Sequence, residues 1–262
     1  MSTNSLLTVK NLKVYFSGEE ILHKVINGVY LEIMPSEIVA LVGGSGSGKT
    51  LTALSILRLL PEAAHIAEGK IIFQSRDLLK MNSEEMLRIR GKEIGMVFQE
   101  PLSAFNPLFT VGFQVEEVLR FHTSLSKREM HMRIRELLRQ VGITDPEKVI
   151  NDYPHQLSGG LRQRAMIAQA IAASPRLIIA DEPTSNLDVT LQAQIMELFR
   201  SLKKELGISI FLITHDLAMV AHLADKVAVI NQGKIVEFGK ATEIMQNPRD
   251  IYSKQLAEAV RI

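Results

Sequence analysis

Residues 43–50 of the chain read Gly43-Gly44-Ser45-Gly46-Ser47-Gly48-Lys49-Thr50. This order fits the phosphate-binding pattern of two spaced glycines followed by Lys and Ser or Thr. An apolar, β-branched run at 37–42 precedes it, and leucines at helical spacing follow it until Pro61. We therefore predict a phosphate-binding loop between a strand and a helix.

The residue types in this loop suit a nucleotide. Without side chains at Gly43, Gly46 and Gly48, the backbone can wrap an anion so that N–H groups and the helix start point at phosphate. We expect Lys49 to reach the β- and γ-phosphates and Thr50 to hold Mg²⁺ through its hydroxyl. The alternative is a chance glycine- and serine-rich loop, which the flanking strand and helix disfavour.

Composition sets the general class of the protein. The 262 residues are 46% hydrophobic and 23% charged, which suits one large globular domain or a core with a subdomain. A net charge of +1 gives no overall attraction to nucleic acid, and the absence of cysteine excludes disulfides and thiolate chemistry. The start at Met1–Ser5 lacks a secretory pattern, and no apolar run is long enough to cross a bilayer. We expect a cytosolic location, with any membrane role exerted through a membrane-embedded partner.

The N-terminal part is predicted to form an antiparallel β layer. Residues 7–16 and 25–33 are rich in strand-forming residues and are separated by a turn near Ser17-Gly18. Phe16 or Tyr15 could stack on an adenine ring, since an aromatic face binds a base without a set hydrogen-bond pattern. The alternative for either residue is a core or edge aromatic.

Acidic and amide side chains follow two further predicted strands. Residues 94–98 end at Gln99, and residues 177–180 deliver Asp181 and Glu182. Ligands of open α/β sheets bind outside the carboxyl ends of the strands. Asp181 is suited to hold Mg²⁺, directly or through water, and Glu182 to orient or deprotonate an attacking water. The alternative is a pair of exposed acids that begin a turn.

A histidine follows the next strand in the same way. Residues 208–213 form an apolar run that presents Thr214 and His215 at its end. A lone histidine is more often structural, but this position favours hydrogen bonding to a γ-phosphate.

The middle of the chain has helical periodicity. Residues 111–141 carry apolar positions at helical spacing in two helices, which predicts a helical subdomain. After Leu157, Ser158 can cap a third helix that opens with Gly159 and Gly160. This helix start is either a second anion-binding end or an ordinary capped helix.

Taken in order, these features resemble the ATP-binding subunit of an ABC transporter over nearly the whole chain. The motifs that carry the resemblance are the Walker A loop Gly43–Thr50, the Q-loop residue Gln99, the signature Leu157-Ser158-Gly159-Gly160, the Walker B strand Leu177–Asp181 with Glu182, the D-loop Ser185-Asn186-Leu187-Asp188 and the switch residue His215. In register with this family, Phe16 takes the adenine-stacking position and Tyr15 becomes second choice.

The resemblance implies an α/β fold of the ABC-type P-loop NTPase class. Its parts would be a RecA-like core, an N-terminal antiparallel β subdomain and an inserted α-helical subdomain. In one ABC ATPase domain over 1–262, we expect the core at about 1–98 and 172–240, the helical subdomain at about 99–171 and a short tail at 241–262.

The resemblance also implies the activity, the cofactors and the partners. ATP and Mg²⁺ are the implied cofactors of a hydrolysis that powers transport. The implied catalytic residues are Lys49, Gln99, Glu182 and His215; the implied Mg²⁺ contacts are Thr50, Gln99 and Asp181; the implied nucleotide contacts are Phe16, all eight residues of the loop, Ser158, Gly159 and Gly160. We expect membrane permease subunits, a second ATPase subunit (self or a paralogue) in a head-to-tail dimer, an indirect link to an extracytoplasmic solute-binding protein, and no nucleic acid. The location would be peripheral, on the cytoplasmic face of the membrane.

Two kinds of residue refine the resemblance. Asn106-Pro107 after the Q-loop looks like the peptide/nickel importer branch, which indicates import. Leu161 stands where the signature often has Gln, and Asn186 where the D-loop often has Ala. Neither change removes a catalytic group.

The transported solute is the finest inference. Gly44 stands where many peptide importers have Glu, and the chain ends at Ile262 without the cysteine-bearing extension of many peptide-importing relatives. We therefore expect nickel or a metal chelate, with a di- or oligopeptide importer as the alternative. A soluble ABC ATPase acting on DNA or ribosomes, or a binding module without turnover, are further alternatives. The single phosphate loop and the lack of a long heptad run argue against the soluble ATPase, and Glu182 and His215 argue against the binding module.

Overall fold

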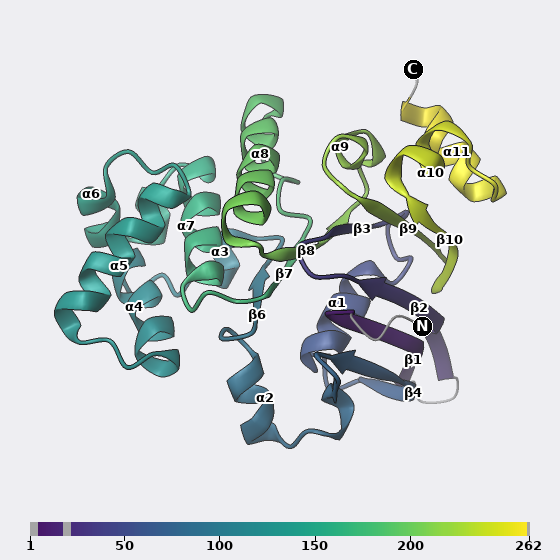
Figure 1. Ribbon diagram of the computed structural model, residues 1–262, viewed down its shortest axis with the longest axis horizontal. Coiled ribbons are helices and arrows are strands. Elements are labelled where there is room, and N and C mark those ends of the chain that lie inside the picture. The colour runs from purple at the N-terminus through teal and green to yellow at the C-terminus, as the bar shows by residue number, and fades with distance from the viewer. Residues whose placement is uncertain (1–4, 18–21, 261–262) are drawn as a thin grey trace. The chain divides into compact units, whose positions relative to one another are not determined.

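A computed structural model describes residues 5–17 and 22–260, and the chain divides into two compact units. The first unit contains residues 1–86 and 203–262, and the second contains residues 87–202. Figure 1 labels their helices and strands.

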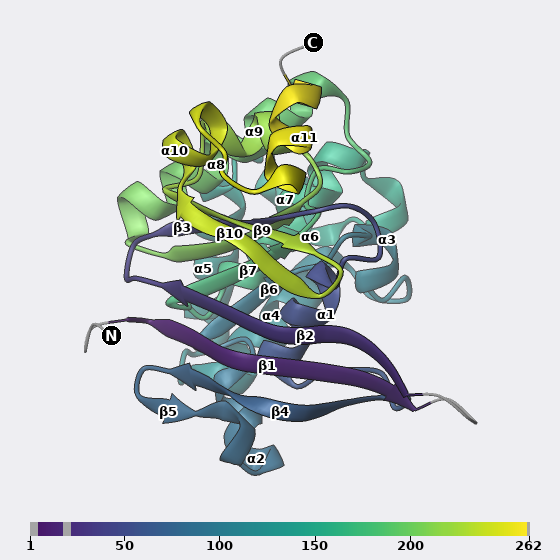
Figure 2. The ribbon, with the colours of Figure 1, turned by 90° about the vertical axis from the view of Figure 1, so that its right-hand side faces the viewer.

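An antiparallel sheet in the first unit confirms the predicted β layer. Its strand order is β2-β1-β4-β5, from β1 (Leu7–Ser17), β2 (Leu22–Ile33), β4 (Ala64–Phe73) and β5 (Arg76–Asp77), as Figure 2 shows. In β1 the buried positions change from odd to even numbers around Asn11, which has a φ of +48°. The register against β2 and β4 shifts at the same place, as expected for a β-bulge. The bulge keeps both halves of β1 facing the core.

A second sheet in this unit carries the phosphate loop. Strands β3 (Ile38–Val42), β8 (Ser209–Thr214), β9 (Lys226–Asn231) and β10 (Lys234–Lys240) lie in the order β10-β9-β3-β8. Strand β3 is parallel to both neighbours and all five of its residues are buried, which explains its continuous apolar run. Strands β9 and β10 form an antiparallel hairpin.

Short helices complete the first unit. They are α1 (Lys49–Leu57), the 3₁₀ helix η1 (Leu78–Lys80), α2 (Ser83–Ile89), whose last three residues belong to the second unit, α9 (Leu217–Ala221), α10 (Ala241–Gln246) and α11 (Ile251–Val260). Helix α11 packs against α9, α10 and β10. The C-terminal segment is therefore part of the folded unit.

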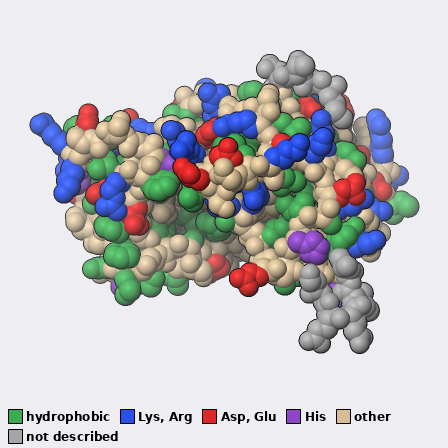
Figure 3. Space-filling model, turned by 90° about the horizontal axis from the view of Figure 1, so that it is seen from below, with side chains coloured by type: hydrophobic (Ala, Val, Ile, Leu, Met, Phe, Trp, Pro, Cys, Tyr) green, Lys and Arg blue, Asp and Glu red, His purple; other side chains and the backbone are tan. Residues whose placement is uncertain are grey.

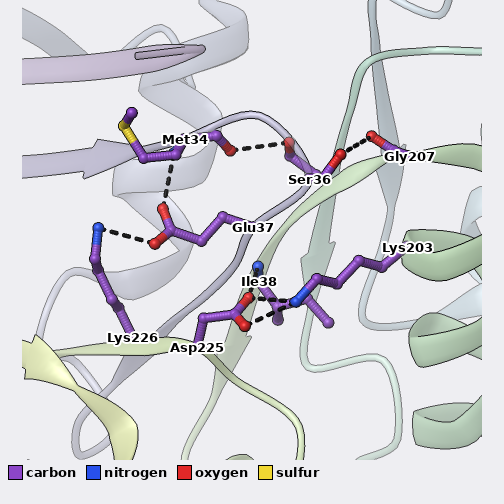
Figure 4. Close-up of polar contacts among 9 residues, drawn as sticks. Met34, Ser36, Glu37, Ile38, Lys203, Gly207, Asp225 and Lys226 are labelled. Carbon is purple, nitrogen blue, oxygen red and sulfur yellow. Dashed lines mark hydrogen bonds and ion pairs between the residues drawn. The ribbon is translucent and has the colours of Figure 1, made fainter. Parts of the chain in front are cut away.

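Charged side chains fix the start of β3, at the end away from the phosphate loop (Figure 4). The Asp225 carboxylate accepts the Ile38 N–H at 2.7 Å and the Lys203 ammonium at 2.7 Å. The Glu37 carboxylate accepts the Met34 N–H at 2.7 Å and pairs with Lys226 at 2.8 Å. These bonds tie β3 to the entry of β9.

The second unit combines two parallel strands with helices. Strand β6 (Ile94–Val97) pairs with β7 (Leu177–Asp181). Between them, the chain forms α3 (Pro101–Ala104), α4 (Val111–His122), α5 (Lys127–Gln140), α6 (Pro146–Asn151), the 3₁₀ helix η2 (Pro154–Gln156) and α7 (Gly159–Ile171). Helix α8 (Val189–Leu206) follows β7. Helices α4 to α7 pack on one another, which is visible on the left of Figure 1. A capping box between Ser126 and Glu129 begins α5. This packing confirms the predicted helical character of 111–141.

None of the helices in the described parts of the chain combines the length and the apolar character needed to cross a membrane.

Candidate functional site

The phosphate loop lies where the sequence places it, between a strand and a helix. Strand β3 ends at Val42 and α1 begins at Lys49. In the parallel register, Val42 lies opposite Thr214 of β8 and Val229 of β9. The loop therefore leaves the carboxyl edge of this sheet, between the residues that follow β8 and β9.

Close packing and positive φ angles shape the loop. A Cβ atom added to Gly43 would lie 2.3 Å from the Ile230 carbonyl oxygen, so only glycine fits there. Gly46 and Gly48 have φ angles of +73° and +104°. The Ser47 carbonyl accepts the Gly233 N–H at 3.0 Å. The β9–β10 hairpin thus contacts the phosphate loop at Gly43 and Ser47.

The Lys49 side chain is buried within the loop. It is 6% exposed, and its ammonium donates to the Gly43 and Gly44 carbonyls at 2.9 Å each. Thr50 is exposed at the first turn of α1. The helix start is therefore open at the position where a phosphate and a metal ion would be held.

A contact from the C-terminal helix also reaches the loop. The Gly44 N–H donates to the Tyr252 hydroxyl oxygen at 2.8 Å. Tyr252 is the second residue of α11 and lies 208 positions away in the sequence. No pattern in the sequence points to Tyr252, because its contact joins two segments that are far apart in the chain.

His215 follows β8 as predicted and is exposed. The Asp216 N–H donates to the Thr214 hydroxyl at 3.0 Å, and Asp216 caps α9 through the Met219 N–H at 3.0 Å. His215 is therefore on a short, well-tied turn at the carboxyl edge of the sheet.

The two candidate stacking aromatics have different surroundings. Tyr15 has the edge of His65 at 6.3 Å and the Lys24 ammonium over its ring at 5.7 Å. Phe16 is half-buried near the end of β1, opposite Ala64 of β4. These neighbours of Tyr15 favour Phe16 as the stacking residue, and that role stays a prediction.

In the second unit, the strand ends bring the amide and the acids together. Val97 of β6 lies opposite Ala180 of β7, so both strands end at one edge. The Gln99 side-chain amide donates to the Glu182 carboxylate at 3.3 Å. Asp181 is the buried last residue of β7, with 3% exposure. Gln99 and Glu182, which the sequence places after two strands, therefore lie together at this edge.

Glu182 itself has an unusual backbone. Its φ is +42°, in the left-handed region that non-glycine residues seldom adopt. The turn is closed by its carbonyl, which accepts both the N–H and the hydroxyl of Ser185 at 3.2 Å. Non-glycine residues held in this region cluster at functional sites.

Asn186 links the D-loop to the Q-loop within this unit. Its side-chain amide donates to the Glu100 carboxylate, next to Gln99. An alanine, which the family often has here, could not make this bond. The departure noted in the sequence thus has a structural counterpart.

The signature segment begins α7 as predicted. Ser158 is its N-cap and accepts the Leu161 N–H at 3.4 Å, while Ser158 and Gly159 are exposed. The Arg162 guanidinium donates to the Pro154 and Leu157 carbonyls at 2.9 and 2.8 Å. Arg162 therefore fixes the segment that precedes α7, while Ser158 and Gly159 at the start of the helix stay exposed to solvent.

Comparison with known proteins agrees with these features. A family model described as ABC transporter matches residues 26–185. This chain belongs to the ABC transporter family. Its fold is that of the ABC ATPase cassette, which confirms the predicted fold class and enzyme class.

Three curated relatives illustrate the similarity of the cassette. The peptidoglycan transport ATP-binding protein YejF of Agrobacterium fabrum is 47% identical over 98% of this chain and 47% of its own length. The oligopeptide transport ATP-binding protein OppD of Bacillus subtilis is 48% identical over 95% of this chain and 70% of its own length. The dipeptide transport ATP-binding protein DppD of Haemophilus influenzae is 43% identical over 98% and 78%. The cassette thus spans about half of the first relative and about three quarters of the other two.

Two solved structures share its fold. The ATP-binding cassette MJ0796, a dimer in a post-hydrolysis state with ADP and Pi, has a TM-score of 0.81 and 30% identity, over 90% of this chain and 98% of that one. The cbiO1 protein of Clostridium perfringens, part of the cbiONQ ABC transporter complex, has a TM-score of 0.80 and 25% identity, over 99% and 100%.

Proposed function

We propose that this cassette hydrolyses MgATP to drive the import of peptides through membrane permease subunits. The bond between Gln99 and Glu182, beside the buried Asp181, is the observation that carries the hydrolytic part. Glu182 would orient or deprotonate the attacking water, and Gln99 would hold that carboxylate in place. His215 would hydrogen-bond the γ-phosphate.

The residues present fit a magnesium nucleotide. Thr50 offers an exposed hydroxyl at the start of α1, and Asp181 offers a carboxylate at a strand end, both hard oxygen ligands. Mg²⁺ would neutralise charge on the β- and γ-phosphates. Lys49 would move its ammonium from the loop carbonyls to these phosphates.

Peptide is the solute class that the relatives favour. The named relatives OppD and DppD transport oligopeptides and dipeptides, whereas nickel, the first expectation, has no counterpart among them. The chain spans only part of these relatives, so its end at Ile262 supports neither solute. The other argument for nickel, Gly44, has a local explanation in its contact with Tyr252.

Uptake measurements test this proposal. In cells lacking the gene, uptake of a labelled tripeptide should fall to background while ⁶³Ni uptake stays at the parental level. The intact gene should restore peptide uptake and the Glu182→Gln variant should not. Loss of nickel uptake with normal peptide uptake would establish the nickel alternative instead.

Exposed apolar side chains on the second unit support a membrane-embedded partner. Leu108 is 77% exposed and Phe121 66% exposed, and the rings of Phe109 and Phe113 stack at 4.7 Å. Figure 3 shows hydrophobic side chains at the surface on its left, where the helices of this unit lie. We propose that these residues contact the permeases and hold the cassette peripherally on the cytoplasmic face of the membrane.

Co-purification tests the partner. Leu108→Asp should reduce recovery of permeases with the cassette, and Leu206→Asp, at a 43% exposed position on α8, should not. Recovery of nucleic acid or ribosomes in place of permeases would favour the soluble alternative.

A second cassette completes the proposed site. Each ATP would lie between the phosphate loop of one chain and the open start of α7 of the other, where N–H groups and the helix dipole favour anions. On the Glu182→Gln background, ATP should produce dimers in light scattering, alone or with a paralogue. Ser158→Arg should abolish them and preserve ATP binding, because the long side chain occupies the phosphate position. ATP-driven dimers that survive Ser158→Arg would exclude this helix start.

A further inference from the structure

Both polar backbone groups of Gly44 are used. Its N–H donates to the Tyr252 hydroxyl at 2.8 Å. Its carbonyl accepts the Lys49 ammonium at 2.9 Å and the Ser47 N–H at 3.3 Å. The first two peptide planes of the loop are therefore set by one aromatic hydroxyl and one ammonium.

Tyr252 is held firmly where it meets the loop. The Asp250 carboxylate accepts the Tyr252 N–H at 2.8 Å, and the Glu237 carboxylate of β10 accepts the N–H groups of Arg249 and Asp250 at 3.0–3.2 Å. Helix α11 lies beside β10 in Figures 1 and 2, and β10 pairs with β9, the neighbour of β3. The tyrosine and the loop thus belong to one connected framework.

We propose that Tyr252 is a positioning residue of the nucleotide site, which acts by fixing Gly44 before ATP arrives. The inference rests on the proposed binding of ATP at the phosphate loop. Glycine-rich segments have many accessible conformations in the unbound state. An anchor that removes some of them lowers the ordering cost of binding.

The same contact explains which side chain position 44 tolerates. A Cβ atom added to Gly44 would lie 3.1 Å from the Tyr252 hydroxyl oxygen, closer than ordinary van der Waals contact. Gly44 and Tyr252 are therefore a coupled pair. A larger residue at position 44 would push the hydroxyl away by a few tenths of an ångström and would weaken the anchor.

Titration of the full-length chain with a fluorescent ATP analogue and Mg²⁺ tests the proposal. Tyr252→Phe should weaken binding about three- to ten-fold, because a neutral hydrogen bond is lost and the ring remains. Tyr30→Phe, at an exposed tyrosine of β2, is the matched control and should bind as the unmodified chain does. The KM for ATP should rise as much as the dissociation constant while kcat changes less than twofold. The unfolding midpoints of the two Phe variants should agree.

A double-mutant cycle isolates the coupling. Gly44→Ala should weaken ATP binding in the unmodified chain and cause no further loss in Tyr252→Phe, where no hydroxyl opposes the methyl group. Additive effects, or equal or tighter binding by Tyr252→Phe, would overturn the proposal. Lys49→Ala separates this failure from failure of the proposed function. If Lys49→Ala binds ATP normally, the loop is not the nucleotide site, whereas loss of binding in Lys49→Ala with normal binding in Tyr252→Phe rejects only the anchor.

Discussion

Replacing Gly43 with alanine should disrupt the phosphate loop, and the size of the effect follows from the structure. The added Cβ atom would lie 2.3 Å from the Ile230 carbonyl oxygen and 2.9 Å from the Ser47 hydroxyl oxygen. Ile230 is a fully buried residue of β9 that is paired with Ile235 of β10. The carbonyl therefore cannot retreat without breaking the hairpin that holds the loop.

We expect a cost of about 3 kcal/mol, at the upper end of typical overpacking because backbone opposes the new atom. For a chain of this size that corresponds to a fall in the unfolding midpoint of about 6–12 °C. Binding of ATP should be lost as well, because the clash can be relieved only if the phosphate loop leaves the conformation that would bind the nucleotide.

Gly46→Ala is the matched control within the same loop. Its φ is +73° but an added Cβ atom meets nothing within 4 Å. Only the left-handed backbone penalty applies, about 1 kcal/mol or a fall of about 2–4 °C. Calorimetry and nucleotide titration of both variants provide the comparison. Equal destabilisation by the two substitutions would refute the argument that close approach of Ile230, rather than glycine flexibility, shapes this loop.

Three further substitutions test other parts of the molecule. Glu182→Gln should retain ATP affinity and slow single-turnover hydrolysis by orders of magnitude, and unchanged turnover would remove Glu182 from the mechanism. Asp225→Asn should lower the unfolding midpoint by about 2–4 °C, because the partly exposed pair with Lys203 loses its charge while Ile38 keeps an acceptor; a normal midpoint would make the pair dispensable. Burial, and then nearby Lys92, lowers the pKa of His122 below its ordinary 6.5, so the unfolded chain binds this proton more readily. Stability should therefore fall as the pH drops below about 6.5, and less so in His122→Gln, as urea titrations at several pH values would show; identical pH profiles would contradict this assignment.

The features that could be predicted from the sequence are those with a local or periodic cause. Continuous apolar runs identify β3 and β7 because both are buried on all sides. Parallel strands share an edge, so the residues after them meet, as Gln99 and Glu182 do. Caps such as Ser158 and Asp188 follow from side chains that bond a nearby N–H.

The features that could not be predicted depend on contacts between distant segments or on irregular backbone. The bulge at Asn11 changes which positions of β1 point to the core, and no residue pattern in the sequence predicts it. Strand β4 begins at Ala64, well before the apolar residues at its end, because pairing with β1 extends it. The short helix α2 lacks a long enough apolar period to be recognised.

Gly44 shows how such a contact changes an inference. From the sequence motif alone, glycine in place of glutamate at position 44 would indicate which solute is transported. In the structure its N–H bonds the Tyr252 hydroxyl, and an added Cβ atom would lie 3.1 Å from that oxygen, so a side chain at position 44 requires the hydroxyl to shift. The residue at position 44 is thus coupled to the packing of α11. A nickel preference therefore has to be sought in the proteins that bind the solute, and variation at position 44 should follow variation at position 252.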